Sequence, residues 1–473
     1  MNKKDNVLII GAGLCGSLLA LRMAQRGYKV TLVEKRPDLR NIEQDAGRSI
    51  NLSLSDRGLR GLRLAGVEEE AKKQCIPMHG RMIHDKQGNT FLSKYSGRKN
   101  EFINSISRPG LNMLLLDAAE KMPNVKLFFN HGCETVDLEN ASATFKDYKT
   151  GALTTFEGDI LLGTDGAGSA VRRSMFNNRE FLFSFSLDWL THGYKELTIP
   201  PADNGSYRTD KNALHIWPRG EDMLIALPNM DGSFTVTLFL PYADSNYCFE
   251  NLITREKVQE YFQTEFPDAL ALMPNLTEEF FENPTGPLGT IKCSPWNSFG
   301  KSLLLGDAAH AIVPFYGQGM NASFEDVVVF DEVLEEFEDK LFSGELDWKK
   351  IFQEYEKARK KDTDAIADLA VDNFHEMKEH TASELFQQKR KLEMAFEAEF
   401  PDRYYSKYSM VTFNENISYD EAMTRGRAQD KAILNLIDDG ELPETMPLNE
   451  KLILVKRTTE EILDDNAILG KLK

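Results

Sequence analysis

Three glycines near the N-terminus have the spacing of a nucleotide-binding loop. Gly11, Gly13 and Gly16 come directly after the apolar residues 7–10. In such a loop the first glycine permits a tight turn, the second lets a pyrophosphate approach the backbone, and the third lets a helix pack closely on a sheet. Glu34 lies 18 residues after Gly16, where a carboxylate can accept hydrogen bonds from ribose hydroxyls. An acid there suits an unphosphorylated ribose and favours FAD or NAD over NADP as the bound nucleotide.

Two further acids come where apolar runs end. Asp165 follows residues 159–163, and Asp307 follows residues 302–305. An acid at the exit of a parallel strand lies at the carboxyl edge of the sheet, where nucleotide cofactors bind. A glycine loop alone is often only a tight structural turn, but the two acidic segments shift the balance toward a cofactor site.

These residues need a parallel sheet to bring them together. Residues 7–10 and 30–33 are short apolar runs typical of buried parallel strands. Residues 17–25 between them favour a helix, which Gly27 ends. The pattern therefore predicts a strand–helix–strand unit and, with it, a Rossmann-like α/β domain.

A different pattern begins at about residue 179. Every second residue from 234 to 240 is Phe, Val or Leu, and Phe239 lies on the opposite face of the predicted strand. We expect residues 215–217 and 224–227 to be its partners in an antiparallel sheet inserted into the α/β domain. Beyond about residue 325 the chain is charged and helical, and we expect most of those charges to face solvent.

The composition excludes several classes of protein. The 473 residues include 74 acidic and 56 basic side chains, so the formal net charge is −18. A chain this acidic is a poor binder of nucleic acid or of an anionic membrane surface. The five cysteines include no CxxC pair, which argues against a disulfide framework or a zinc ribbon, and the sequence shows no metal-ligand cluster. Because no apolar run reaches about 18 residues, we expect a cytoplasmic protein without a membrane anchor.

The glycine loop and the segments around Asp165 and Asp307 together resemble those of the flavin-dependent aromatic hydroxylases. Longer segments resemble the branch of this family that hydroxylates kynurenine, namely residues 48–52, 81–84, 192–194, 196–201, 215–219, 314–321 and 408–413. The resemblance implies an α/β fold (α+β overall) with a Rossmann-like FAD-binding domain, an inserted antiparallel-sheet substrate domain and a C-terminal helical region. The expected segments are 1–75, 104–178 and 285–340 for the first, 76–103 and 179–284 for the second, and 341–473 for the third.

The resemblance also implies a set of cofactor contacts. These are Gly11, Gly13, Cys15, Gly16, Glu34, Lys35, Arg36, Ser53, Arg108, Cys133, Asp165, Asp307, Gly319, Met320 and Asn321. We expect Cys15 and Cys133 to make contact through their backbone, with inert thiols. Taken alone, Arg108 would be only the start of a helix before Pro109, and His310 is expected to be structural.

The expected substrate is a zwitterionic amino acid that carries an aniline ring. Its carboxylate calls for a guanidinium with neutral donors beside it, and the resemblance assigns this role to Arg81, supported by Tyr95, Asn373 and Tyr408. For the aromatic ring it implies Phe239, Pro314, Phe315 and Tyr316. Without the resemblance, Arg81 would be interpreted as a surface arginine and Asn373 as a polar helix residue. Tyr95, Tyr408 and Phe239 would be ordinary packing side chains.

The reaction follows from the family as well. FAD is reduced by NADPH and reacts with dioxygen to a flavin hydroperoxide, which transfers one oxygen atom to L-kynurenine and gives 3-hydroxy-L-kynurenine. The protein positions the ring and excludes water, while the cofactor supplies the difficult chemistry. No residue is assigned as an acid or base. The resemblance places this step in tryptophan degradation and in NAD biosynthesis.

Alternatives stay open from the sequence. A flavin-dependent halogenase would carry a Trp-x-Trp-x-Ile-Pro element, and none of the four tryptophans lies in one. A hydroxylase of another aromatic acid would share the motifs described, because the shape of a substrate site is not readable from sequence. A flavin-binding protein without turnover would bind FAD but show no NADPH oxidation stimulated by kynurenine.

Overall fold

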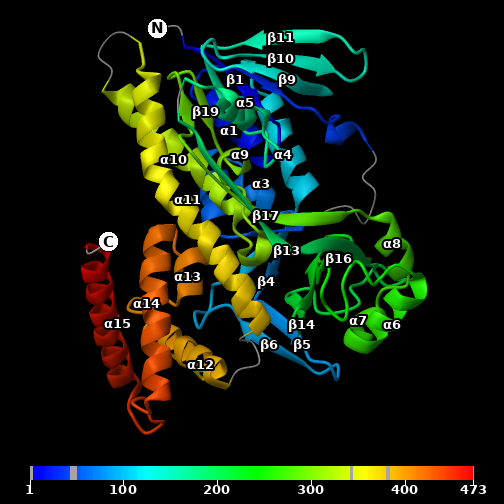
Figure 1. Ribbon diagram of the computed structural model, residues 1–473, viewed down its shortest axis with the longest axis vertical. Coiled ribbons are helices and arrows are strands. Elements are labelled where there is room, and N and C mark those ends of the chain that lie inside the picture. The colour runs from blue at the N-terminus through cyan, green and yellow to red at the C-terminus, as the bar shows by residue number, and fades with distance from the viewer. Residues whose placement is uncertain (1–3, 43–50, 181, 341–344, 380–383, 472–473) are drawn as a thin grey trace. The chain divides into compact units, whose positions relative to one another are not determined.

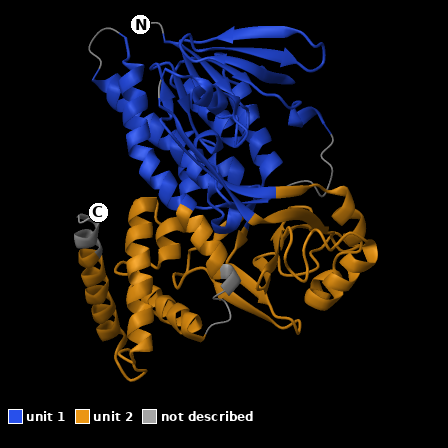
Figure 2. Cartoon of the chain, viewed as in Figure 1, with its two compact units in different colours: residues 1–76, 105–190, 287–367 blue, residues 77–104, 191–286, 368–473 orange. Residues whose placement is uncertain are grey.

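A computed structural model describes residues 4–42, 51–180, 182–340, 345–379 and 384–471. Of the segments that carry the family resemblance, residues 48–50 lie outside the part of the chain that the structure describes. The chain forms two compact units (Figures 1 and 2), and each is assembled from three separate segments. Unit 1 comprises residues 1–76, 105–190 and 287–367, and unit 2 comprises residues 77–104, 191–286 and 368–473. The functional assignment of these segments to cofactor and substrate stays a prediction.

Unit 1 is built on a six-stranded sheet with the strand order β18-β19-β12-β1-β2-β8. Its strands are β1 (Asn6–Ile10), β2 (Lys29–Val33), β8 (Val125–Phe128), β12 (Ile160–Gly163), β18 (Asn297–Ser298) and β19 (Ser302–Leu304). The pairings β8-β2-β1-β12-β19 are parallel, and only β18 runs antiparallel to its neighbour. Continuous apolar runs such as 160–162 are buried here, as strands covered on both faces require. The predicted strand–helix–strand unit is confirmed.

Three long helices pack around this sheet. They are α1 (Leu14–Gln25), α4 (Arg108–Glu120) and α10 (Gly319–Asp339), and α1 contacts both others. The shorter elements of unit 1 are η1 (Leu39–Asn41), β3 (Asn51–Leu54), α2 (Asp56–Leu64), α3 (Glu68–Lys72), β9 (His131–Asp137), β10 (Ser142–Asp147), β11 (Leu153–Glu157), α5 (Ala170–Asn177), α9 (Asp307–His310) and η2 (Pro314–Tyr316). Strands β9, β10 and β11 form a separate antiparallel sheet.

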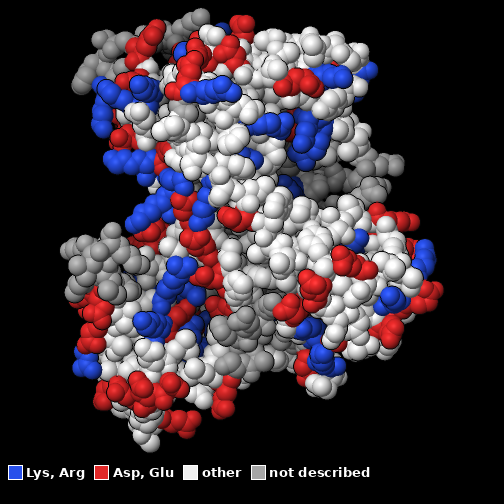
Figure 3. All heavy atoms as spheres, viewed as in Figure 1, with Lys and Arg blue, Asp and Glu red and all other residues white. Residues whose placement is uncertain are grey.

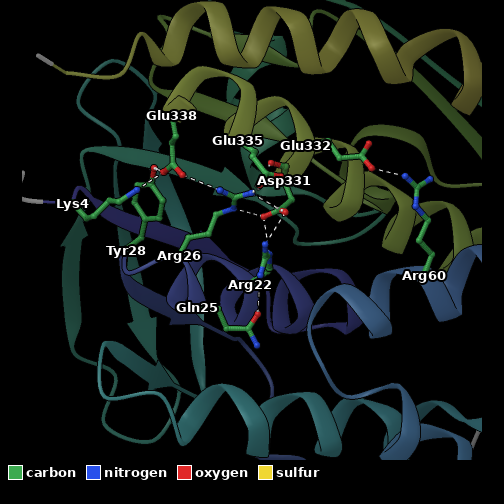
Figure 4. A network of polar contacts seen from close by, with 10 residues as sticks. All are labelled: Lys4, Arg22, Gln25, Arg26, Tyr28, Arg60, Asp331, Glu332, Glu335 and Glu338. Atoms are coloured by element: carbon green, nitrogen blue, oxygen red, sulfur yellow. Dashed lines mark hydrogen bonds and ion pairs between the residues drawn. The ribbon is translucent and has the colours of Figure 1, made fainter. Parts of the chain in front are cut away.

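A polar network joins α1 to α10 (Figure 4). Asp331 of α10 accepts hydrogen bonds from Arg22 at 2.8 and 3.0 Å and from Arg26 at 3.0 Å. Arg26 also donates to Glu338 at 2.8 Å, and the hydroxyl of Tyr28 donates to the same carboxylate at 2.6 Å. Burial alone would raise the pKa of Asp331, but the hydrogen bonds from Arg26 and Arg22 hold it below its ordinary value. The network fixes the helix that begins at the glycine loop.

Unit 2 contains most of a seven-stranded sheet with the order β17-β13-β16-β15-β14-β5-β6. Its strands include β5 (Gly80–His84), β6 (Thr90–Lys94), β14 (Leu214–Arg219), β15 (Asp222–Pro228) and β16 (Phe234–Pro241). Five elements contain residues of both units: β4 (Cys75–Met78), β7 (Ile103–Ser107), β13 (Ser184–Ile199), β17 (Thr285–Ser294) and α11 (Trp348–Glu379). Strands β3, β7 and β4 form a small sheet in that order.

The predicted antiparallel sheet is present, with two differences. Strand β16 pairs antiparallel with β15, as expected for residues 224–227, but its other neighbour is β13. The prediction that residues 215–217 pair with β16 was wrong, because β14 pairs with β15 instead. In addition, β14 pairs in parallel with β5, with Leu214 opposite Arg81. Local alternation identifies a strand but carries no information about which strand is its neighbour.

Helices α6 (Arg255–Glu265), α7 (Pro267–Leu270) and α8 (Leu276–Glu282) pack on one face of this sheet. The core beneath them contains the alternating residues of β16, from Phe234 to Leu240. Phe239 is buried but does not belong to that core, which confirms that it points to the opposite face.

The chain ends in four helices of unit 2. They are α12 (Glu384–Glu399), α13 (Lys407–Thr412), α14 (Tyr419–Asp438) and α15 (Leu448–Lys471), and a small apolar core with Phe396 and Ile433 holds α12, α14 and α15 together. Of the helices that the structure describes, none combines the length and the apolar character needed to traverse a bilayer. On the face shown in Figure 3, acidic and basic side chains lie interspersed on both units.

Candidate functional site

The glycine loop has the geometry that a pyrophosphate requires. Gly11 has a φ of 101°, and a Cβ there would lie 2.6 Å from the carbonyl oxygen of Thr164. At Gly16 a Cβ would lie 1.9 Å from the carbonyl oxygen of Gly11. A Cβ on Gly13, in contrast, would meet nothing within 4 Å. The outer two glycines therefore permit close packing, and the middle one faces open space.

The start of α1 next to this space is suited to an anion. Gly13 is the N-cap, and among the described residues no side chain caps this end and no acid lies in the first turn. The first amides of a helix carry partial positive charge and lack partners within the helix. The loop thus offers N–H donors and room at the same place, which fits the pyrophosphate of FAD.

Glu34 links the glycine loop to the end of β2. One oxygen of its buried carboxylate accepts a hydrogen bond from the amide of Ala12 at 2.8 Å. The other accepts from the amide and the Nε of Arg36, at 3.0 and 2.8 Å. A carboxylate has about four acceptor positions, so Glu34 can hold the loop and still receive a ribose hydroxyl. Lys35 and Arg36 are exposed beside it.

Asp165 directs its carboxylate at the start of α5. It accepts a hydrogen bond from Ser169 at 2.5 Å and one from the amide of Ala170 at 2.6 Å. Burial raises the pKa of Asp165, which these hydrogen bonds partly oppose. The residue thus closes the loop next to Gly11, and its role toward a cofactor stays a prediction.

Asp307 follows a turn that a buried ion network holds in place. Gly306 has a φ of 61°, and its amide donates to Asp326 at 2.8 Å. Asp326 also lies 2.5 Å from the Nε2 of His310 and accepts from Arg359 at 2.8 Å. Burial raises the pKa of Asp307, while the charges of Arg108 and His310 oppose that rise. His310 is thus part of the support of the turn that carries Asp307.

Two members of this network, Asp326 and Arg359, were not predicted from the sequence. Both are almost completely buried, and so is Glu325, which accepts hydrogen bonds from Arg57 at 2.6 Å and from Arg359 at 2.8 Å. The adjacent acids Glu325 and Asp326 stand just before the apolar residues 327–330. An acid pair beside such an apolar run is the signal that could have pointed to burial.

Asn321 ties the loop after η2 to β3. Its side-chain nitrogen donates to the carbonyl oxygens of Ser53 and Gly317, both at 2.9 Å, and its oxygen accepts from the amide of Ser55 at 3.0 Å. The side chain is fully buried. These bonds bring Ser53, Asn321 and the neighbouring Gly319 and Met320 into one region of unit 1.

The two cysteines among the predicted cofactor contacts are poor nucleophiles. Burial raises the pKa of the Cys15 thiol well above its ordinary value and that of Cys133 to about 12. Both thiols are therefore protonated at neutral pH, as a thiolate is required for redox reactivity. Arg108 is the first residue of α4, whose N-cap is Ser107.

In unit 2, Arg81 lies against two tyrosine rings. Its guanidinium carbon is 4.8 Å from the ring centroid of Tyr408 and 5.7 Å from that of Tyr95. The two rings are stacked, with centroids 5.7 Å apart and planes inclined by 9°. Arg81 also shares a side-chain hydrogen bond with Tyr408. We refer to Arg81, Tyr95 and Tyr408 as the Arg81 clamp.

The hydroxyl of Tyr95 is buried, and no described residue gives it a hydrogen-bond partner. Burial raises the pKa of both tyrosine hydroxyls of the clamp, and Arg81 opposes this only in part, so both are neutral donors at pH 7. A buried hydroxyl without a partner costs about 1–3 kcal/mol. The clamp therefore combines one positive charge with a donor that needs an acceptor, which is the chemistry of a carboxylate site.

The other predicted substrate residues lie on three different elements. Asn373 is buried on α11, and Phe239 is buried on β16, where it pairs with Tyr194 and Met223. Residues 314–316 form η2 in unit 1, with Pro314 exposed and the two aromatic residues after it buried. The roles of these residues stay predictions.

Comparison with known proteins gives three results. Residues 4–340 match the family model described as "FAD binding domain". A protein of Myxococcus xanthus named kynurenine 3-monooxygenase is 44% identical over 460 residues, which cover 97% of this chain and 95% of that protein. A protein of the same name from Dictyostelium discoideum is 44% identical over 440 residues, covering 91% and 93% of the two chains.

Solved structures share the fold at low identity. A tetrameric 2-methyl-3-hydroxypyridine-5-carboxylic acid oxygenase matches 85% of this chain and 97% of its own, with a TM-score of 0.62 and 20% identity. PqsL of P. aeruginosa, in complex with 2-aminobenzoylacetate, matches 82% of this chain and 99% of its own, with a TM-score of 0.64 and 18% identity. At such identities the likeness concerns the fold alone.

Proposed function

This chain belongs to the kynurenine 3-monooxygenase family of FAD-dependent aromatic hydroxylases, and from that premise we propose that it converts L-kynurenine to 3-hydroxy-L-kynurenine with NADPH and dioxygen. This activity belongs to tryptophan degradation and supplies a precursor for NAD biosynthesis. The substrate is a small zwitterion with an aniline ring, so the protein must bind one carboxylate and position one ring.

The residues of unit 1 fit the FAD that the family requires. The open space at Gly13 and the uncapped start of α1 would receive the pyrophosphate, and Glu34 would receive the ribose. Ser53, Asp307, Gly319, Met320 and Asn321 are the proposed contacts nearer the flavin ring. Since the buried side chain of Asn321 already makes three hydrogen bonds within the protein, its contact would be through the backbone. Bound FAD, reduced by NADPH, supplies the activation of dioxygen.

The observation that carries the proposed substrate is the Arg81 clamp. The guanidinium of Arg81 lies against Tyr95, whose buried hydroxyl has no hydrogen-bond partner among the described residues, and Tyr95 packs in an apolar cluster with Met78, Ile103 and Phe413. A substrate carboxylate would accept from both Arg81 and Tyr95, which would remove the cost of the unsatisfied hydroxyl. Asn373 is the proposed fourth member of this site, and Phe239, Pro314, Phe315 and Tyr316 are the proposed contacts of the aromatic ring.

The chain needs no strong base for this reaction. The amino group of kynurenine already activates the ring carbon ortho to it, where the hydroxyl group is introduced. The tasks of the protein are therefore orientation of the ring and exclusion of water, which positioning residues perform without changing protonation.

The test is NADPH oxidation by the FAD-bound protein with and without L-kynurenine, with the product mass measured by chromatography and mass spectrometry. We expect strong stimulation and a product heavier by one oxygen atom. Stimulation with hydrogen peroxide but no heavier product would make kynurenine an effector and favour another aromatic acid as substrate. An absence of stimulation, with FAD bound, would overturn the proposed function.

A further inference from the structure

Helix α12 carries three charged side chains that are almost completely buried. Lys389, Glu393 and Glu397 are spaced by four residues and lie on one face of the helix, and Glu397 has no exposed surface at all. Exposed charges are ordinary on a helix, but a buried carboxylate needs hydrogen-bond partners to offset its desolvation. The partners of Glu397 therefore indicate its role.

Glu397 receives one backbone amide at each carboxylate oxygen. Oε1 accepts from the amide of Ser406 at 2.9 Å, and Oε2 accepts from the amide of Gly97 at 3.0 Å. Burial would raise the pKa of Glu397, but hydrogen bonds with Ser409, Ser406 and Gly97 hold it below its ordinary value. The side chain is therefore an anion that makes charge-assisted bonds to both amides, and Nη1 of Arg98 lies 3.4 Å from its Oε1 as an ion-pair partner.

These two amides belong to the segments that carry the tyrosines of the clamp. Gly97 comes two residues after Tyr95, and Ser406 comes two residues before Tyr408. Ser406 is also the N-cap of α13, the helix on which Tyr408 lies, and its hydroxyl accepts from the amide of Ser409 at 3.3 Å. One carboxylate thus joins two pieces of backbone that are more than 300 residues apart in the chain.

The contact between α12 and the segment after β6 is direct. A Cβ on Gly97 would lie 2.2 Å from the carbonyl oxygen of Met394 and 2.8 Å from the amide nitrogen of Ala398, so only glycine fits. Arg390 of the same helix donates to the carbonyl oxygens of Lys94 and Tyr95, at 2.9 and 2.7 Å. The backbone on both sides of the Tyr95 side chain is therefore fixed by α12.

We propose that Glu397 is a positioning residue for carboxylate recognition, which sets the distance between Tyr95 and Tyr408 and thereby the geometry of both rings around Arg81. The proposal rests on the proposed function, since it assumes that the Arg81 clamp binds the carboxylate of kynurenine. It predicts that loss of Glu397 impairs recognition of the carboxylate and leaves recognition of the aniline ring intact.

The test compares Glu397→Gln with Glu399→Gln in the FAD-bound protein. A glutamine has one acceptor oxygen and one donor nitrogen, so one of the two amides would face a donor. We expect the KM for L-kynurenine to rise about tenfold with kcat unchanged. The dissociation constant of kynuramine, which is the same aniline ketone without the carboxylate, should stay at its wild-type value. Glu399 is exposed on the same helix, so Glu399→Gln should change neither constant.

Two outcomes would overturn the proposal. Equal weakening of kynurenine and kynuramine would show a general structural role, and wild-type constants for both would show no role at all. If Glu397→Gln does not fold, Gly97→Ala is the second variant, since it keeps the carboxylate but separates the segment from α12. The same loss of discrimination is expected for it, and unchanged discrimination would contradict the proposal.

Hydrogen exchange separates this proposal from the proposed function, because it needs no substrate. We expect faster exchange at the amide of Gly97 or Ser406 in Glu397→Gln than in the wild type. If that acceleration is found but the wild type does not respond to kynurenine, the coupling of the two segments stands and the proposed function fails. Exchange at wild-type rates at both amides would overturn the coupling itself.

Discussion

The rings of Tyr95 and Tyr408 are nearly parallel, inclined by 9° with centroids 5.7 Å apart, although the two residues are 313 positions apart in the sequence. Tyr95 follows β6, and Tyr408 lies on α13. The guanidinium of Arg81 lies within 6 Å of both centroids, a distance at which it interacts favourably with each ring. A charge held in this way is oriented before any ligand arrives.

Replacement of Arg81 by methionine should weaken kynurenine binding without loss of FAD. Methionine keeps the length and apolar character of the side chain but removes the fork of donors, so we expect the KM for kynurenine to rise about 100-fold. The measurement is steady-state NADPH oxidation, with the flavin absorption spectrum as the check on FAD content. Arg81→Lys keeps the charge but not the fork of donors, so its KM for kynurenine should lie between those of the wild type and Arg81→Met. An unchanged KM in Arg81→Met would remove Arg81 from the site.

The variant Tyr95→Phe should affect stability and binding in opposite directions. The hydroxyl is buried without a described partner, so its removal should leave the melting temperature of the ligand-free protein unchanged or raise it. The carboxylate of kynurenine would lose one hydrogen-bond donor of the protein, so the KM for kynurenine should rise about fivefold. Differential scanning fluorimetry and steady-state kinetics measure the two effects. A lower melting temperature together with an unchanged KM would contradict the assignment of this hydroxyl to the substrate.

Alanine at Gly13 and at Gly11 should have different consequences. At Gly13 the backbone is in an ordinary extended conformation and a methyl group meets nothing, so Gly13→Ala should fold normally. It should nevertheless bind FAD at least about tenfold more weakly, because the methyl group would stand where the pyrophosphate is proposed. Quenching of FAD fluorescence on titration measures the affinity.

Gly11→Ala is the contrasting variant. Its φ of 101° and the carbonyl oxygen of Thr164 leave no place for a methyl group, so the FAD-free protein itself should be destabilised. If Gly13→Ala bound FAD with wild-type affinity, the open space at Gly13 would not be the cofactor site.

The ion pairs of Asp331 should give a defined dependence of stability on pH. The pKa of Asp331 in the folded protein lies below its ordinary value, so its contribution is fully present above about pH 4 and is lost as the pH falls through the lowered pKa. Asp331→Asn should therefore lower the free energy of unfolding by about 3 kcal/mol at pH 7. The difference from the wild type should shrink on acidification below pH 4.

The control for that variant lies on the same helix. Glu335 has a side chain that is 61% exposed and lies 3.5 Å from Arg26, so Glu335→Gln should change the free energy of unfolding by no more than about 0.5 kcal/mol. Denaturant unfolding at several pH values measures both variants. A difference between Asp331→Asn and the wild type that persists unchanged below pH 4 would show that charge pairing is not the cause.

The nucleotide-binding half was readable from the sequence because its signals are local. The apolar run of β1, the glycines and Glu34 lie within 30 residues, and together they predict one strand, turn and helix start. The pairing of β14 was predicted wrongly because a strand's neighbour depends on contacts distant in sequence. Arg81 and Tyr408 could be linked only through the family.

Neither a local motif nor the family resemblance pointed to the buried charges on the C-terminal helices. Glu397 and the exposed Glu399 stand in the same acidic stretch, and nothing in their spacing distinguishes them. What buries Glu397 is the approach of Gly97 and Ser406, two backbone amides that a pattern of side chains does not reveal. Likewise, the general expectation of solvated helix charges fits Glu332, Glu335 and Glu336 but not Glu325 or Asp326 on the same helix.

The segmented construction of unit 1 has a consequence for biosynthesis. Strand β1 and the glycine loop are made before the rest of the central sheet, but β1 pairs with β12, and β12 pairs with β19, whose residues are made almost 300 positions later. The central sheet therefore cannot close until residues 302–304 have left the ribosome. Until then the apolar faces of β1, β2 and α1 lack their final neighbours, and a chaperone that shields early apolar segments should bind this protein during translation rather than after it.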